Sequence, residues 1–132
     1  MSQKLTEGFV CSNLSDNFEG LSFKKIPIPS VEENFVKVSI KAASLNFPDL
    51  LMTQGKYQNK PTLPFALGME GAGIVSEVGK QSCTFKEGDE VMFGSWGHGA
   101  IAKEIVLPES MLSQKPKSFS FEEAAAFKTV YL

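Results

Sequence analysis

The clearest pattern in the chain is an alternation of apolar and polar side chains over Phe35–Ala42. Val36, Val38, Ile40 and Ala42 are apolar, and a lysine or serine separates each from the next. A period of two predicts a β-strand with one buried face. Because a slip by one residue would turn all four apolar side chains toward water, we expect the register of this strand to be firmly set.

Shorter apolar runs predict further strands, separated by glycine and proline turns at a spacing typical of a β-barrel or sandwich. The predicted segments are Lys4–Cys11, Leu21–Ile28, Ile74–Val78, Asp89–Phe93, Ala100–Leu107 and the short extended Met111–Gln114. The imperfect alternation in Leu21–Ile28 predicts a bulge or a strand end, and Pro27 and Pro29 are expected to end this strand. The fold class predicted from the pattern is mainly β with one or two short helices.

The first helix is predicted to begin at Asn46 and to end at Gly55. Asparagine is a preferred N-cap, Pro48 fits the first turn, and Asp49 suits the positive end of a helix. Glycine at the position after a helix commonly ends it, so about two turns are expected.

The second helix is predicted to begin after Ser120, which forms a capping box with Glu123 ahead of three alanines. No glycine or proline follows before Leu132. We therefore expect a helix that is still running where the sequence stops, and interpret residues 1–132 as one domain of a longer protein.

Length, composition and charge exclude several classes of function. A chain of 132 residues supports one domain, and its formal net charge of −2 gives no electrostatic footprint for nucleic acid. Eleven phenylalanines predict a core built from aromatic side chains. No 18-residue apolar run predicts a membrane span, and the first 20 residues lack the apolar stretch of a secretory signal. We expect a cytoplasmic protein without membrane or nucleic-acid partners.

Cysteine and histidine are too sparse to predict a metal site. Cys11 and Cys83 lie far apart and match no metal or redox spacing, so two reduced thiols are expected. His98 is the single histidine and has no serine or cysteine partner at a recognisable spacing. We expect an exposed loop histidine and no zinc.

Two glycine-rich segments resemble phosphate-binding loops only superficially. Residues 68–73 have the order G-x-x-G-x-G with a β-rich segment after it, whereas the dinucleotide fingerprint is G-x-G-x-x-G between a strand and a helix. Residues 94–99 meet the same objection. Both are interpreted as turns where backbones approach closely, and Glu70 as a buried, hydrogen-bonded carboxylate.

Two side chains in the middle of the chain are candidates for chemistry, each with a plainer alternative. Asn46 either caps its helix or lies on the wall of a pocket, and the two roles are compatible. Tyr57 either packs as a loop aromatic or donates a hydrogen bond to a substrate carbonyl at a pocket mouth.

Several motifs occur together in an order that resembles the zinc-free quinone oxidoreductase branch of the medium-chain dehydrogenase/reductase superfamily. They are A-x-x-L-N-F-x-D-L-x-x-x-x-G-x-Y, P-x-x-x-G-M-E-G-A-G-I-V-x-x-V-G, K-x-G-D-x-V and E-E-A-A-A-F. The resemblance covers about residues 33 to 132. Zinc alcohol dehydrogenases have a cysteine where this chain has Asn46 and a histidine where it has Met69, and the structural zinc lobe expected after Phe93 is missing.

The resemblance implies a GroES-like, partly open β-barrel, the substrate half of a reductase whose other half is a Rossmann domain that holds NADPH. Asn46 matches an asparagine near the nicotinamide ribose, Asp49 the acidic residue behind it, and Tyr57 a pocket tyrosine. A second family tyrosine sometimes stands where this chain has Leu51. The implied reaction is hydride transfer from NADPH to a quinone or enone, with a homodimer as the expected full-length assembly.

Two alternatives stay open at this point. One is a non-enzymatic GroES-like binding or adaptor module, and the other is an alcohol dehydrogenase-like domain. Since no G-x-G-x-x-G unit follows a predicted strand, we expect residues 1–132 alone to be inactive.

Overall fold

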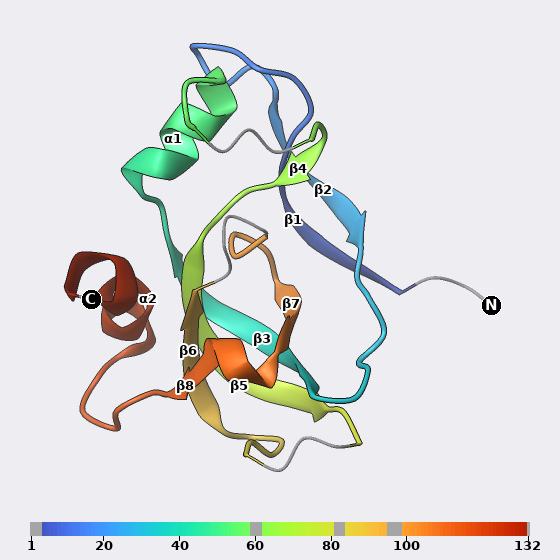
Figure 1. Ribbon diagram of the computed structural model, residues 1–132, viewed down its shortest axis with the longest axis vertical. Helices are drawn as coiled ribbons and strands as arrows, with labels where there is room; N and C mark the ends of the chain where they lie inside the picture. Colours follow the sequence, from blue (N-terminus) through green and yellow to red (C-terminus); the bar gives the residue numbers. More distant parts are fainter. Residues whose placement is uncertain (1–3, 59–61, 81–83, 95–98, 132) are drawn as a thin grey trace.

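Two antiparallel sheets form the body of the molecule (Figure 1). The computed structural model describes residues 4–58, 62–80, 84–94 and 99–131, the last five without their side chains. The smaller sheet has the order β2-β1-β4 and the larger one the order β7-β3-β5-β6-β8. The strands are β1 (Leu5–Cys11), β2 (Leu21–Pro27), β3 (Phe35–Ser44), β4 (Phe65–Ala66), β5 (Glu70–Val78), β6 (Glu90–Gly94), β7 (Glu104–Pro108) and β8 (Leu112–Gln114). The mainly β fold with two short helices expected from the sequence is confirmed.

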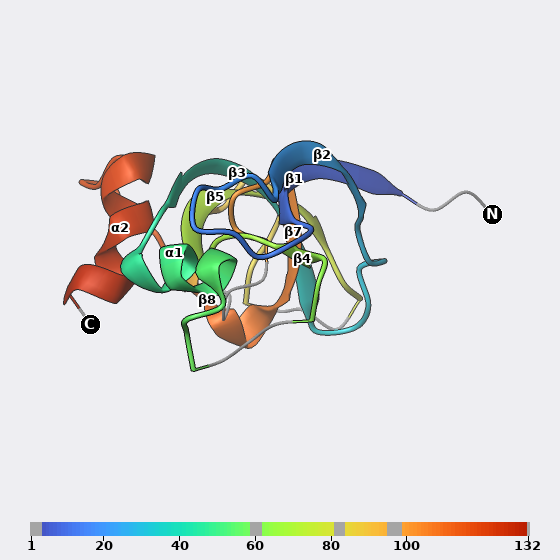
Figure 2. The same ribbon diagram turned by 90° about the horizontal axis from the view of Figure 1, so that it is seen from above.

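Two α-helices complete the fold, α1 (Phe47–Gln54) and α2 (Phe121–Tyr131), with a single 3-10 turn at Glu109–Met111. Helix α1 ends as predicted, because Gly55 takes the left-handed conformation with φ 71°. Helix α2 packs against β5, β3 and β6. Both helices lie on the same side of the strands in the two views, opposite the N-terminal end (Figures 1 and 2). Among the described residues, no helix is long and apolar enough to cross a membrane.

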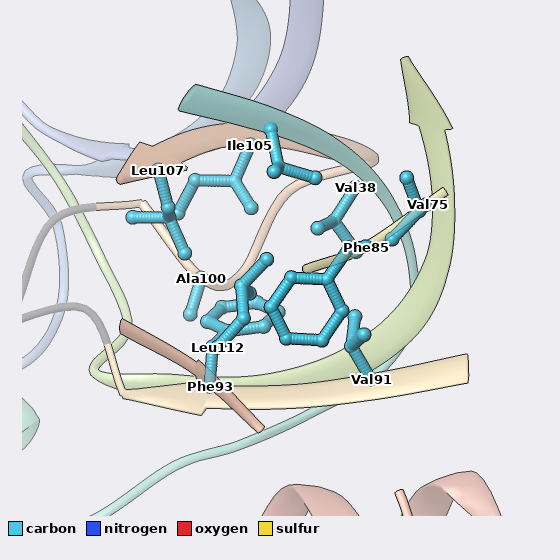
Figure 3. Close-up of a cluster of buried hydrophobic side chains, with 10 residues drawn as sticks. Val38, Val75, Phe85, Val91, Phe93, Ala100, Ile105, Leu107 and Leu112 are labelled. Atoms are coloured by element: carbon cyan, nitrogen blue, oxygen red, sulfur yellow. The ribbon is translucent and has the colours of Figure 1, made fainter. Parts of the chain in front are cut away.

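The larger sheet curls around an apolar core. Val36 and Val38 of β3 are completely buried in this core, as their alternation predicted, and Phe93 of β6 is 1% exposed. Figure 3 shows the side chains converging between the strands. The cluster consists of Val36, Val38, Val75, Phe85, Val91, Phe93, Ala100, Ile105, Leu107 and Leu112.

The four apolar residues of β3 do not share one core. Its pairing with β5 shifts register between Lys37 and Val38 and again between Ile40 and Ala42. Ile40 packs against the sheet core, whereas Ala42 packs against a separate cluster that includes Ala124 and Ala125 of α2. The second register shift therefore directs the side chains at the end of β3 toward α2.

The segment predicted as a glycine turn is a strand. Gly71 and Gly73 lie within β5, and a Cβ on Gly73 would come 2.1 Å from the Ser39 carbonyl oxygen of β3. The close backbone approach expected at these glycines is confirmed, but it occurs between paired strands instead of inside a turn. The second glycine segment lies largely outside the described residues, as do His98 and Cys83. The other cysteine, Cys11, is buried as a free thiol, as predicted.

β2 pairs with β1 without a register shift, so of the two predicted explanations, a bulge or a strand end, the bulge is absent, and the strand ends at Pro27 as predicted. Two details of the other predicted strands were wrong. β7 begins only at Glu104, and β4, two residues long, was not foreseen. β2 is an outer strand with mostly exposed side chains, which explains its irregular pattern, because little packing constrains it.

The chain enters α2 through a tightly held turn. The Ser120 amide donates to Glu123 Oε1 at 2.9 Å and the Glu123 amide donates to Ser120 Oγ at 3.1 Å, so the predicted capping box is confirmed. Hydrogen bonds to the Glu123 carboxylate from the Ser120 amide and from the Ser120 side chain lower the pKa of this carboxyl. The buried Lys115 ammonium donates to the Phe119 carbonyl at 2.5 Å and pairs with Glu90 at 3.2 Å. Together these contacts fix the direction in which α2 leaves the sheet.

Candidate functional site

A pocket of about 530 Å³ opens beside α1. We call it the α1 pocket. Its lining is largely apolar, and its polar members come from the first turns of α1 and the residue before it. The lining residues are Phe18, Leu21, Leu45, Asn46, Phe47, Asp49, Leu50, Thr53 and Leu67. A mostly apolar cavity with a few polar groups is the usual form of a small-molecule site.

Asn46 occupies the N-cap position of α1 and forms a capping box with Asp49. Its backbone is extended, with φ −122° and ψ 164°. Its Nδ2 donates to Glu70 Oε1 of β5 at 3.0 Å. The two roles predicted for Asn46 therefore occur together: it lies at the start of the helix as its cap residue and lines the α1 pocket.

Glu70 is the centre of a small buried network. It is 1% exposed, as the sequence predicted for a hydrogen-bonded carboxylate. Ser44 Oγ lies 2.6 Å from the same Oε1 atom and 3.0 Å from the carbonyl oxygen of Ala125 in α2. The network thus joins β3, β5, α1 and α2 behind the α1 pocket.

Asp49 is completely buried in the first turn of α1. Its Oδ2 accepts from the Asn46 backbone amide at 2.8 Å. No hydrogen bond of normal geometry from the described residues reaches Oδ1, although the Gly68 amide lies near enough to lower the pKa of the carboxyl. The net pKa of Asp49 is raised, first because burial removes water from the charged form and also because Glu70 lies nearby.

Tyr57 lies apart from the other two predicted site residues. It is partly buried and packs against the cluster of Cys11, Met52, Phe65 and Leu67. Tyr57 does not line the α1 pocket, but Leu67 belongs to both the pocket and this cluster. The structure brings Asn46 and Asp49 together, whereas Tyr57 packs against a cluster that shares only Leu67 with the pocket lining, and its role in chemistry stays a prediction.

Ser44 is the member of the site that the sequence did not reveal. A serine at the end of a predicted strand gives no pattern that distinguishes it from a surface residue. Only the irregular pairing near the end of β3 and the packing of α2 explain why its hydroxyl is directed into the network.

The described part of the chain contains no group of three or more side chains that could bind a metal ion, counting histidine, cysteine, aspartate and glutamate. Where zinc alcohol dehydrogenases have ligands, the chain has Asn46 and Met69. Met69 packs against the cluster that contains Tyr57. The residues described here offer amide, hydroxyl and carboxyl groups to a ligand in the α1 pocket.

The family follows from comparison with known proteins. Residues 32–117 match the alcohol dehydrogenase GroES-like domain, so the chain belongs to this family. Its relatives include proteins named quinone oxidoreductase-like, and its structural neighbours include quinone oxidoreductases of the medium-chain dehydrogenase/reductase superfamily, which confirms the resemblance seen in the motifs.

Two relatives and one solved structure illustrate the range of proteins that the chain is similar to. The chain is 42% identical over 96 residues to "Quinone oxidoreductase-like protein 2 homolog" of Nematostella vectensis, covering 73% of this chain and 26% of that protein. It is 39% identical over 101 residues to "Synaptic vesicle membrane protein VAT-1 homolog" of Rattus norvegicus, covering 74% and 24%.

The Escherichia coli quinone oxidoreductase complexed with NADPH superposes with a TM-score of 0.82 at 32% identity, over 91% of this chain and 36% of that one. The chain spans about a quarter to a third of the length of the curated relatives it matches.

Proposed function

We propose that residues 1–132 form the substrate-side domain of an NADPH-dependent oxidoreductase that reduces quinones or enones. The observation that carries this proposal is the Asn46 amide, which donates to Glu70 and lines an apolar pocket. The quinone oxidoreductase-like relatives and the NADPH complex of the Escherichia coli enzyme support it.

The site residues fit a nicotinamide cofactor and a flat apolar substrate. The Oδ1 atom of Asn46 faces the Asp49 amide in the capping box, and an amide oxygen has a second lone pair that can accept from a ribose hydroxyl. Asp49 holds the Asn46 backbone from behind. Bound NADPH supplies the hydride, and this chain supplies position and polarity.

Tyr57 is the proposed donor to the oxyanion that develops on the reduced substrate. A preorganised hydroxyl at such a position contributes about 10²-fold or more to a rate. Because Tyr57 does not line the α1 pocket, this role requires the segment that carries Tyr57 to move toward the pocket when substrate binds.

Oxidation of NADPH by the full-length protein in the presence of a quinone tests the proposal. We expect turnover without added metal, and a fall of about 10²-fold in kcat for Tyr57→Phe. The neighbouring exposed Lys56→Met is the control and should leave kcat unchanged. Unchanged kinetics in Tyr57→Phe would remove Tyr57 from the mechanism, and absence of turnover with quinones and enones would refute the function.

The domain by itself is proposed to be inactive. Its sequence holds no G-x-G-x-x-G unit between a strand and a helix, so the pyrophosphate of NADPH has no glycine turn to rest on. In the full-length protein we propose that a Rossmann domain supplies this turn, that two copies form a homodimer, and that the protein acts in the cytoplasm without zinc. A metal assay of the purified protein separates this from the alcohol dehydrogenase alternative.

A binding or adaptor module is the second candidate. The similarity to a protein named as a synaptic vesicle membrane protein homolog favours it. The gene sequence that follows the codon for residue 132 distinguishes the enzyme from the binding module. A Rossmann fingerprint encoded there supports the enzyme, and a stop codon supports the module.

A further inference from the structure

The atoms around Glu70 specify how the Asn46 amide is oriented. Glu70 Oε1 receives two contacts, from Asn46 Nδ2 at 3.0 Å and from Ser44 Oγ at 2.6 Å. A carboxylate oxygen only accepts hydrogen bonds, so the nitrogen of the Asn46 amide has to face it. The carbonyl oxygen of the same amide is thereby turned away from Glu70 and toward the Asp49 amide of the capping box, and it keeps a second lone pair for a further donor.

We propose that Glu70, supported by Ser44, is a positioning residue that fixes the Asn46 side chain with Oδ1 presented to the ligand. The group bound at Oδ1 is then a hydrogen-bond donor, and a hydroxyl of the cofactor ribose has the required chemistry. This inference rests on the proposed function and adds the two residues that make Asn46 an acceptor instead of a donor.

Burial gives Glu70 this control. Its side chain is 1% exposed, whereas Asn46 is only half-buried and lines the α1 pocket. An exposed asparagine would turn its amide freely, since its oxygen and nitrogen are similar in size. A buried acceptor raises the cost of the flipped orientation, because two oxygen atoms would then face each other without a proton between them.

Ser44 extends the network to α2. Its hydroxyl carries one proton and stands near two acceptors, Glu70 Oε1 at 2.6 Å and the Ala125 carbonyl oxygen at 3.0 Å. The docking of α2 thus helps to set where Ser44 holds the carboxylate, and through it the Asn46 amide.

Four variants of the full-length protein test the positioning role through the NADPH dependence of turnover. Glu70→Met keeps the size of the side chain and removes both acceptor oxygens. We expect the KM for NADPH to rise about tenfold, the effect of losing one well-made hydrogen bond, with kcat changed less than about twofold. Glu70→Gln keeps an acceptor oxygen and should stay within about twofold of the wild type in both constants.

The double variant distinguishes positioning from mere structural support. Asn46→Ala should raise the KM for NADPH about as much as Glu70→Met, and the pair combined should be no worse than Asn46→Ala alone, because Glu70 acts through Asn46. Glu77→Met is the matched control. It lies on the same strand, pairs with Lys37 at 3.5 Å on the surface, and should leave both constants unchanged.

Each outcome decides the matter. A wild-type KM in Glu70→Met, a Gln variant as weak as the Met variant, or additive effects in the double variant would overturn the inference while the proposed function stands. If wild-type protein neither binds NADPH in calorimetry nor oxidises it, the function fails and the inference fails with it. If Glu70→Met does not fold, Ser44→Ala replaces it, with an expected rise of about threefold in KM, and no rise would refute the positioning role.

Discussion

The sheet core and the region around α1 distribute their side chains in opposite ways. In the sheet core, apolar side chains such as Val38 and Phe93 are buried and carboxylates are absent from the cluster. Around α1, two carboxyl side chains, Asp49 and Glu70, are buried, while Leu45 and Phe47 are 68% and 69% exposed. Stability is therefore expected to depend on the first region, and ligand binding on the second.

The contrast follows from what each region must do. A core gains free energy by removing apolar surface from water, at roughly 25 cal/mol per Å². A binding site keeps apolar surface for a ligand and holds polar groups in fixed directions, which costs stability when carboxyl groups are buried. The four predictions below run from the largest expected effect to the smallest.

Phe93→Ala should break the sheet core. Phe93 is 1% exposed and belongs to the core cluster of the larger sheet, so removal of its ring leaves a cavity that costs about 3–5 kcal/mol of unfolding free energy. Phe47→Ala in the α1 region is the comparison and should change stability by less than about 0.5 kcal/mol. Urea unfolding measures both, and equal losses would erase the contrast between the regions.

Gly73→Ala should disturb the pairing of β3 with β5. The added Cβ would come 2.1 Å from the Ser39 carbonyl oxygen, so the strands have to separate, at a cost of about 2–3 kcal/mol. Gly94→Ala is the control, because the nearest atom would be 3.7 Å away. If Gly73→Ala left the unfolding free energy unchanged in the same assay, the strands would be able to accept the added Cβ without losing their pairing.

Ser120→Ala should loosen the start of α2, which lies against both regions. The variant loses the bond from the Glu123 amide, and an N-cap of this kind is worth about 1 kcal/mol. Ser118→Ala in the same turn should have no effect. Thermal unfolding followed by circular dichroism measures the difference, and equal melting temperatures would contradict the role of the capping box.

Asp49→Asn should alter the pH dependence of stability. The pKa of Asp49 is raised in the folded protein, so the native state binds a proton more tightly than the unfolded chain. Its contribution to stability is then present at low pH and is lost as the pH rises from the ordinary value of 3.8 through the raised folded pKa.

Unfolding midpoints of the wild type and of Asp49→Asn across this range test the sign. The stability of Asp49→Asn relative to the wild type should increase as the pH rises toward neutrality. A relative decrease would show that the folded protein favours the charged carboxylate.

Local signals predicted the elements whose causes are local. The strand at Phe35–Ala42, the Gly55 stop and the Ser120–Glu123 capping box depend on patterns within a few residues, and the structure has all three, although only Val36 and Val38 of the alternating apolar residues are fully buried. The buried state of Glu70 was also predicted, since a lone carboxylate in an apolar strand needs a partner.

Features that depend on tertiary packing were missed. The register shifts near Val38 and Ala42 depend on the partner strand, and the two-residue β4 exists only through its pairing with β1. The expected aromatic core is partial, because Phe9, Phe18, Phe23 and Phe47 are exposed. At the site, Asn46 and Asp49 were predicted, but the contact of Asn46 with Glu70 and the role of Ser44 require the fold.

Calorimetric titration of NADPH tests most directly the claim that this domain positions a ligand that another domain holds. Full-length protein should release heat with a saturable isotherm, whereas residues 1–132 should show none up to about 1 mM, the range of the weakest specific binding. Saturable binding of NADPH to residues 1–132 alone would contradict the claim.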